Sequence, residues 1–298
     1  MQYIEIIVGT VIAAALLLCF FYFNNRSIVT TEYRIGASAT GTGTEALRIA
    51  QVSDLQSRSF GEGQANLLKR VKAANPDIIV ITGDLIDRNF TNYEAAMQAV
   101  RGLSEIAEVL YVQGNHEQSL SADDYANFLG DAEKYMKILF NKRYEFKKCG
   151  KKYIFGGLSQ AVIDESRGYN RDNRNHDEKI IIEAAEKIFD GAGKGFRILL
   201  AHEPQLFDIY AKTPCDLVLT GHAHGGQFRI PFIKKGIYSP EQGLFPKYFQ
   251  GVHEKQREDG SRFEMVVSRG LGNSKFPIRL FNRPEIVFVS VSCVDFLF

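Results

Sequence analysis

The apolar positions of the chain fall into blocks of different length, and the first block differs from the later ones. Residues 4–23, IEIIVGTVIAAALLLCFFYF, form a nearly continuous apolar run with one charge, Glu5. Twenty helical residues span about 30 Å, the thickness of a bilayer's hydrocarbon layer. We therefore expect a single transmembrane anchor over residues 1–24. The alternative is a buried core helix. A cleaved signal peptide is disfavoured, because such peptides have a basic start and a cleavage site of small residues, and this run has neither.

Beyond a polar stretch that we expect to be a linker, residues 25–45, short apolar runs alternate with segments of helical periodicity. Such alternation is typical of layered α/β proteins with a largely buried sheet, so residues 46–298 are predicted to form the main domain. The expected strands cover 47–53, 77–82, 108–113, 152–158, 196–202, 215–222, 262–268 and 285–291. The expected helices cover 64–74, 92–104, 122–139 and 177–190, and the polar run 164–177 is expected to be a surface loop with His176 exposed to solvent.

Composition and charge narrow the choice of function. A chain of 298 residues with 45% hydrophobic residues can bury a substantial core. Its net charge of +1 argues against a protein that coats a polyanion, so we expect no nucleic-acid partner. Arg26 and Arg34 follow the apolar run and no Lys or Arg precedes it, which by the positive-inside tendency places the domain of this single-pass membrane protein in the cytoplasm. Two arginines leave the opposite orientation open.

Polar residues follow directly after five of the apolar runs. Ligands of open α/β sheets bind outside the carboxyl ends of the strands, so these residues are predicted to converge on one edge. Each of them alone is compatible with an ordinary turn or cap, but the five together favour a shared site. They are Asp54 after RIAQVS, Asp84 after DIIVITG, Asn115 and His116 after VLYVQG, His202 after RILLA, and His222 and His224 after DLVLTG.

Oxygen and imidazole donors without a thiolate suit divalent ions such as Mn, Fe or Zn. The candidates are too many for one tetrahedral ion, and two metal ions that share a bridging carboxylate fit them better. The sequence therefore predicts a centre with two divalent metal ions.

Read in order, the motifs SDLQ, GDLID, GNHE, AHEP and GHAHGG resemble the five-block signature of the calcineurin-like metallophosphoesterase superfamily. With the apolar N-terminal run and the segment SRGLGNSKFPIRLFNRPEIV, the chain is similar to the membrane-anchored bacterial branch of that superfamily. The resemblance covers about residues 46–292. It implies a four-layer α/β/β/α sandwich, preceded here by one transmembrane helix.

The resemblance also implies roles for individual residues. His116 would donate a proton to phosphate or to the leaving group, Asp87 would orient His116, and Arg88 would clamp phosphate beside Asn115 and His116. Two cations would polarise the phosphate and activate a bridging water that attacks phosphorus. One metal would be held by Asp54, Gln56, Asp84 and His224, and the other by Asp84, Asn115, His202 and His222.

Gln56 departs from the usual pattern of the first block, which is DxH. Some branches that hydrolyse phosphodiesters or pyrophosphates carry DxQ, as this chain does. An amide oxygen is a weaker and harder donor than imidazole, so we expect a weaker first site with a bias toward Mn or Fe over Zn. The alternative is that Gln56 hydrogen-bonds in the loop and a water takes its coordination position.

The resulting prediction is a metal-dependent phosphohydrolase, with phosphodiesters or pyrophosphates favoured as substrates. The apolar N-terminal run suggests a lipid-linked or envelope substrate. The alternative from a different class is a catalytically inactive member of the superfamily that serves as a binding scaffold at the membrane. Inactive members typically lose the histidine of the GNHE block or the bridging aspartate, and this chain keeps both His116 and Asp84.

Overall fold

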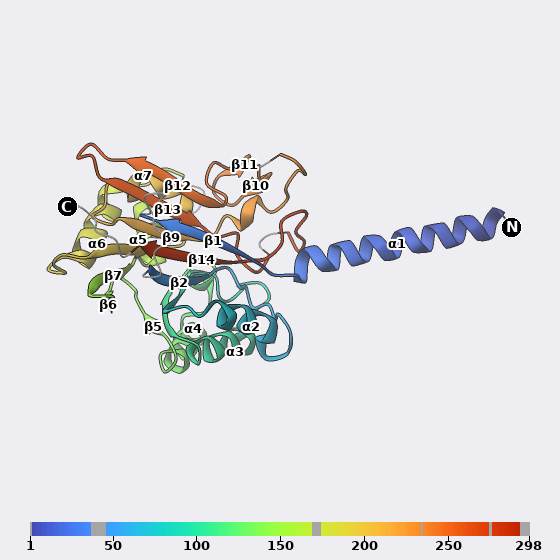
Figure 1. Cartoon of the computed structure of the whole chain (residues 1–298), viewed down its shortest axis with the longest axis horizontal. Helices are drawn as coiled ribbons and strands as arrows, with labels where there is room; N and C mark the ends of the chain where they lie inside the picture. The colour runs from blue at the N-terminus through green and yellow to red at the C-terminus, as the bar shows by residue number, and fades with distance from the viewer. Residues whose placement is uncertain (1, 37–45, 169–173, 234, 274–275, 293–298) are drawn as a thin grey trace.

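The computed structural model describes residues 2–36, 46–168, 174–233, 235–273 and 276–292. The chain begins with helix α1 (Gln2–Arg26), which projects from the domain as a rod (Figure 1). Its sides are apolar all round, and none of its most apolar window is buried. The alternative of a buried core helix is therefore wrong. Among the described residues, α1 is the one helix that is long and apolar enough to cross a membrane, a test that a signal sequence also meets.

Part of the segment expected to be a linker belongs to the sheet instead. Residues 29–35 form strand β1 (Val29–Ile35), which pairs in parallel with β14 (Glu285–Ser292) from Val29 opposite Glu285 to Ile35 opposite Val291. The sequence VTTEYRI alternates between half-buried and exposed side chains, the pattern of an edge strand with one face on the core. Only two residues separate α1 from this strand, and residues 37–45 lie outside the described part of the chain.

Two six-stranded mixed sheets form the centre of the domain. The first has the order β1-β14-β2-β3-β4-β5 and the second the order β12-β13-β9-β8-β7-β6. Strands β2, β3 and β4 run parallel to one another, as do β7, β8 and β9. The remaining bounds are β2 Ala46–Val52, β3 Ile78–Thr82, β4 Glu108–Val112, β5 Lys137–Ile138, β6 Arg143–Lys148, β7 Lys151–Gly157, β8 Phe196–Leu200, β9 Leu217–Thr220, β12 Gly251–Gln256 and β13 Arg262–Val267. A short hairpin, β10 (Tyr238–Ser239) and β11 (Gly243–Leu244), lies outside both sheets.

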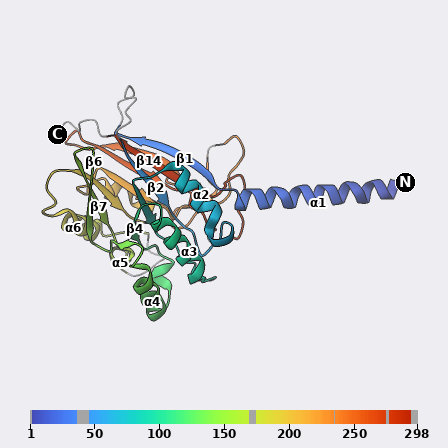
Figure 2. The same ribbon diagram turned by 60° about the horizontal axis from the view of Figure 1, so that its bottom comes forward.

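Three apolar cores separate four layers, as the resemblance implies. The inner faces of the two sheets pack on each other, with Ile49 and Val80 from the first sheet and Ile198 and Leu219 from the second. A second core lies between the first sheet and three helices, which Figure 2 brings forward, and a third lies between the second sheet and three other helices. The first set is α2 Ala65–Ala74, α3 Tyr93–Ser104 and α4 Ala122–Ala132, and the second is α5 Gln160–Ser166, α6 Glu178–Phe189 and α7 Phe207–Tyr210. Single 3₁₀ turns occur at Glu62–Gln64, Glu117–Ser119, Pro204–Leu206 and His224–Gly226.

Some element boundaries differ from the sequence-based expectations. The helix expected over 122–139 ends at Ala132, because the chain then turns to pair β5 with β4 and to bury Met136. The loop expected over 164–177 begins inside α5 and continues into residues outside the described part. His176 is half-buried, and its Nδ1 lies 2.7 Å from the Ser166 hydroxyl, so the expectation of an exposed histidine is wrong.

Candidate metal centre

The site lies where the carboxyl ends of strands from both sheets meet. β2, β3 and β4 of the first sheet deliver Asp54, Asp84 and Asn115, and β8 and β9 of the second deliver the histidines. The two sheets are joined directly above this edge, because the Gln51 amide of β2 donates to the Thr220 carbonyl of β9 at 2.8 Å. The backbone N–H of His222 also donates to the Asp54 carboxylate across the same junction. The sequence-based prediction of one shared edge agrees with this arrangement.

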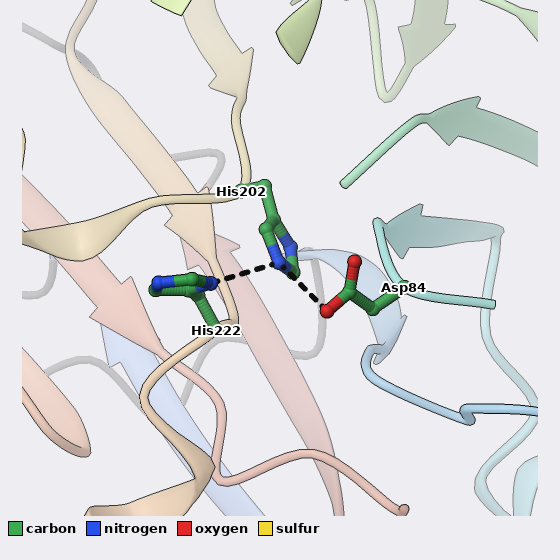
Figure 3. A group of neighbouring side chains, drawn as sticks. All are labelled: Asp84, His202 and His222. Atoms are coloured by element: carbon green, nitrogen blue, oxygen red, sulfur yellow. Dashed lines mark hydrogen bonds and ion pairs between the residues drawn. The ribbon is translucent and has the colours of Figure 1, made fainter. Parts of the chain in front are cut away.

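One group of donors forms around Asp84, His202 and His222, shown in Figure 3. His202 Nε2 lies 3.2 Å from Asp84 Oδ2 and 3.2 Å from His222 Nδ1. The side-chain oxygen of Asn115 lies 3.0 Å from the same nitrogen of His222. These four side chains come from four loops, those after β3, β4, β8 and β9, and all but Asn115 are buried. Carboxylate, amide and imidazole donors therefore converge on one small volume.

The hydrogen bonding of His202 fixes which of its nitrogens faces this volume. Its Nδ1 lies 2.8 Å from the Thr82 carbonyl, which can only accept, so Nδ1 carries a proton. In the neutral ring the Nε2 lone pair then points at Asp84 and His222, an arrangement that favours a bound cation. Burial alone would lower the pKa of His202, but the Asp84 carboxylate overrides it and raises this pKa to about 10.

A second group of donors forms around Asp54, Asp84 and His224. His224 Nε2 lies 3.5 Å from Asp54 Oδ1, and all three side chains are buried. Burial raises the pKa of Asp54 to about 6, against the opposing charge of His202, and burial together with Arg279 lowers the pKa of His224 well below its usual value. Asp84 belongs to both groups, so the two donor sets share one carboxylate.

Gln56 lies beside the second group and presents its amide to it. Its Nε2 lies 3.4 Å from Asp84 Oδ2 and 3.3 Å from His224 Nε2, while its Oε1 is buried without a hydrogen-bond partner among the described residues. A half-turn of the amide group would exchange the two atoms and bring the oxygen toward Asp84 and His224. The side chain therefore has the position that a ligand needs, and its role stays a prediction.

The backbone of the site is held in a conformation that side chains rarely adopt. Positive φ angles between 47° and 64° occur at Asp54, Gln56, Asp84, His222 and His224. Such residues cost free energy and persist only where surrounding contacts fix them, commonly at functional sites. Close approach of the loops adds a second constraint, because a Cβ on Gly221 would lie 2.3 Å from Asp54 Oδ2.

Glu117 has a role that sequence reasoning missed. Its carboxylate is buried and accepts hydrogen bonds from the backbone N–H groups of Asp84, Ile86 and Gly114 at 2.8 to 3.0 Å. It thereby fixes the loops after β3 and β4 against each other. Burial and the Asp84 carboxylate raise the pKa of Glu117 to about 7. The available signal was its place in the GNHE block, directly after His116.

His116 is buried next to the donor groups. Its Nε2 lies 3.9 Å from Asp84 Oδ2, and its Nδ1 lies 3.3 Å from the backbone nitrogen of Arg88, which donates to it. Asp87 Oδ2 lies 3.8 Å from the same Nδ1, too far for a hydrogen bond. The other carboxylate oxygen of Asp87 accepts from the backbone of Asn89 and Phe90. Asp87 therefore shapes the loop, and the Arg88 side chain is exposed at its edge.

Two further residues support the histidine loop from the C-terminal segment, and sequence reasoning missed both. The fully buried guanidinium of Arg279 donates to the backbone carbonyls of Arg269 and Gly272, and its Nη2 lies 3.5 Å from His224 Nδ1. Asn282 Nδ2 donates to the His224 carbonyl at 2.7 Å. Burial lowers the pKa of Arg279 to about 9. In the sequence, the one indication of these two residues is that they belong to the segment IRLFNRPE, part of the stretch on which the resemblance to the membrane-anchored branch rests.

The residues present fit cations at both groups. In each, the residues are buried and the donor atoms lie within 4.8 Å of one another. The lone pairs of the carboxylate and two imidazoles of the first group, and of the two carboxylates and one imidazole of the second, repel one another unless a positive charge lies between them. The buried Gln56 Oε1, which lacks a partner among the described residues, provides a further neutral donor at the second group. Oxygen and nitrogen donors of this kind suit borderline divalent metals.

Comparison with known proteins agrees with this chemistry. The chain is 27% identical over 274 residues to the uncharacterized metallophosphoesterase YkuE of Bacillus subtilis, covering 90% of this chain and 87% of the relative. It is 24% identical over 220 residues to the phosphodiesterase YaeI of Escherichia coli, covering 72% and 70%. The solved NAD nucleotidase of Haemophilus influenzae shares the fold, with a TM-score of 0.50 and 13% identity over 76% of this chain and 45% of that one.

The family model for calcineurin-like phosphoesterases matches residues 47–226, which include every donor of both groups. That match spans more than half of the chain and carries all five sequence blocks. The chain therefore belongs to the calcineurin-like phosphoesterase family and is a metal-dependent phosphoester hydrolase.

Proposed function

We propose that this protein hydrolyses phosphodiester or diphosphate bonds at a centre of two divalent metal ions. The observation that carries the proposal is the carboxylate of Asp84, which both donor groups share. The first ion would be held by Asp54, Gln56, Asp84 and His224, and the second by Asp84, Asn115, His202 and His222. Mn, Fe and Zn are the candidates. When bound, such a pair supplies Lewis acidity toward the phosphate and lowers the pKa of bound water.

The protein side chains would position and protonate the substrate. His116 is suited to donate a proton, because the Arg88 N–H that donates to Nδ1 leaves the proton of the neutral ring on Nε2, which faces Asp84 and the site. The backbone N–H of His116 donates to Asp84 Oδ1 at 2.9 Å and so ties the acid to the shared carboxylate. The exposed Arg88 and the half-buried Asn115 would contact phosphate oxygens at the entrance.

Two features support a diester or diphosphate over a monoester. Gln56 replaces the histidine that is usual at that position, and the relative YaeI is named as a phosphodiesterase. We further propose that α1 anchors the domain in the cell membrane, with the domain on the cytoplasmic side favoured by Arg26 and Arg34, and that the substrate is lipid-linked or part of the envelope.

The proposal is tested with the full chain in detergent, loaded with Mn, Fe or Zn. We expect hydrolysis of bis(p-nitrophenyl) phosphate that exceeds hydrolysis of p-nitrophenyl phosphate and that stops when a chelator removes the metal. Metal analysis should return two ions per chain. A metal-loaded protein that cleaves no diester, diphosphate or monoester would instead be a binding scaffold.

A further inference from the structure

Large apolar side chains that face solvent are concentrated in one part of the domain. Outside α1, eight of the ten in the described residues lie in two segments, 230–245 and 276–281. Scattered exposed apolar residues are normal on soluble proteins, but a concentration of this kind marks an interaction surface. We call the six most exposed of these the apolar rim: Phe232, Ile233, Leu244, Phe245, Phe276 and Phe281.

The apolar rim borders the base of α1. The ring of Phe281 packs on Phe20 of α1, with centroids 5.2 Å apart, and the guanidinium of Arg283 lies 4.5 Å from the centre of the Phe23 ring. Asn25 at the end of α1 accepts a hydrogen bond from the backbone of Arg279 at 2.8 Å. Phe20 and Phe23 belong to the apolar run 4–23. Phe281 therefore contacts the very part of the helix that a bilayer would surround.

The candidate metal centre lies at the same end of the domain. β1 starts next to α1 and runs away from it, β14 runs parallel to β1, and β2 runs antiparallel to β14. β3 and β4 are parallel to β2, so the carboxyl ends of all three point back toward α1. Figure 1 shows α1, the β10–β11 hairpin and the described part of the loop between β13 and β14 together at this end.

Three residues of the apolar rim have a rare backbone conformation. Phe232, Phe245 and Phe281 have φ angles of 66°, 54° and 52°, which bulky residues rarely adopt. Hydrogen bonds hold the backbone at or next to two of them, because the Phe245 N–H donates to the Ile237 carbonyl at 2.9 Å and the Arg229 N–H donates to the Leu280 carbonyl at 3.0 Å. Strained conformations that surrounding contacts maintain point to function.

We propose that the apolar rim inserts into the lipid interface beside α1 and holds the metal centre toward the headgroup layer. This inference rests on the proposed membrane anchor and gives the substrate class of the proposed hydrolase as phosphoesters of that layer. Aromatic and aliphatic side chains next to a cation, here the exposed Lys235, are the usual composition of an interfacial segment. Asn282 and Arg279, which flank Phe281 of the rim, contact His224, so the segment that would dock on the membrane also supports the candidate metal centre.

The chain contains no tryptophan, which makes a direct test possible. Single-tryptophan variants of the full chain, Phe232→Trp and Phe245→Trp, are placed in phosphatidylcholine bilayers with brominated acyl chains, which quench tryptophan on contact. Leu17→Trp in α1 reports whether the helix is in the bilayer. Glu258→Trp is the matched control, because residue 258 is exposed in the β12–β13 turn at the opposite end of the domain.

We expect quenching and a blue-shifted emission for the variants at 232 and 245, as for the variant at 17, and neither for the variant at 258. Quenching at 17 with none at 232 and 245 overturns docking and leaves the anchor intact. Absence of quenching at 17 overturns the anchor and the docking together. Blue-shifted but unquenched emission at 232 and 245 shows that a second copy of the chain covers the rim, which also overturns the proposal. None of these readouts depends on hydrolysis, so a failure of the proposed reaction is detected separately.

Discussion

Substitution of Gly221 by alanine should disturb the donor group that contains Asp54 and spare the group of Asp84, His202 and His222, through a steric clash whose size follows from the structure. An ideal Cβ at this position would lie 2.3 Å from Asp54 Oδ2 and 1.9 Å from the Ser53 hydroxyl oxygen, whereas real Cβ contacts are essentially never shorter than 3.0 Å. The Asp54 carboxylate and the backbone of residue 221 must therefore separate by at least about 0.7 Å, the difference between 3.0 and 2.3 Å. Metal–ligand distances tolerate only about 0.2 Å, so the group that contains Asp54 loses this ligand.

The expected result is a selective loss. Overpacking of this kind costs about 1–3 kcal/mol of stability. The group of Asp84, His202 and His222 lacks Asp54 and should retain its ion. Metal analysis should fall from two ions per chain toward one, and calorimetry should detect the lower unfolding temperature.

Gly130 provides the matched control. It lies within α4, and a Cβ there meets no atom within 4 Å. Gly130→Ala should keep both ions and should stabilise the helix by about 0.5–1 kcal/mol, because alanine has the better helix propensity. If Gly221→Ala keeps two ions and the wild-type unfolding temperature, the close approach of Gly221 to Asp54 does not constrain the site, and this reasoning is refuted.

Three further substitutions address the donors themselves. Asp84→Ala should empty both groups, since they share this carboxylate, and metal analysis that still finds one tightly held ion would contradict the shared role. His116→Gln should keep the metal content and lower turnover by about 10²- to 10⁴-fold, the scale of a lost general acid, whereas an unchanged turnover number excludes that role. Gln56→His should tighten one site and shift it toward Zn, and Gln56→Ala should weaken that site alone. Equal affinities of wild type and both Gln56 variants in metal titrations would show that Gln56 is no ligand.

The sequence was sufficient to predict the edge that carries the site, because its physical basis is local. A buried parallel strand is recognisable from a short apolar run, and the polar residue that follows it must lie at the carboxyl edge. Asp54, Asp84 and His202 could therefore be assigned to one site without knowledge of the sheet order. The order of the strands within each sheet could not be predicted from the pattern of apolar and polar positions.

Features that depend on distant parts of the chain could not be predicted in this way. The sequence of β1 resembles a linker, because its seven residues alternate only weakly between apolar and polar. Its partner β14 lies about 250 residues further on, as the hydrogen bond between Thr31 and Glu285 shows. Arg279 resembles a surface arginine in sequence, yet it is fully buried beneath the loop of His224. The GNHE block marks the position of Glu117, but its role became visible only from its three backbone partners.

The donor groups contain residues from both sheets of the sandwich, so a bound ion would link the two sheets mechanically. Asp84 follows a strand of the first sheet and His202 a strand of the second, and the contact between Thr82 and His202 joins positions 120 residues apart. A cation held between them is a crosslink that closes a long loop, and such closures restrict the unfolded chain. Removal of the metal should therefore lower the unfolding temperature as well as turnover, and the two sheets should separate more readily in the stripped protein than in the loaded one.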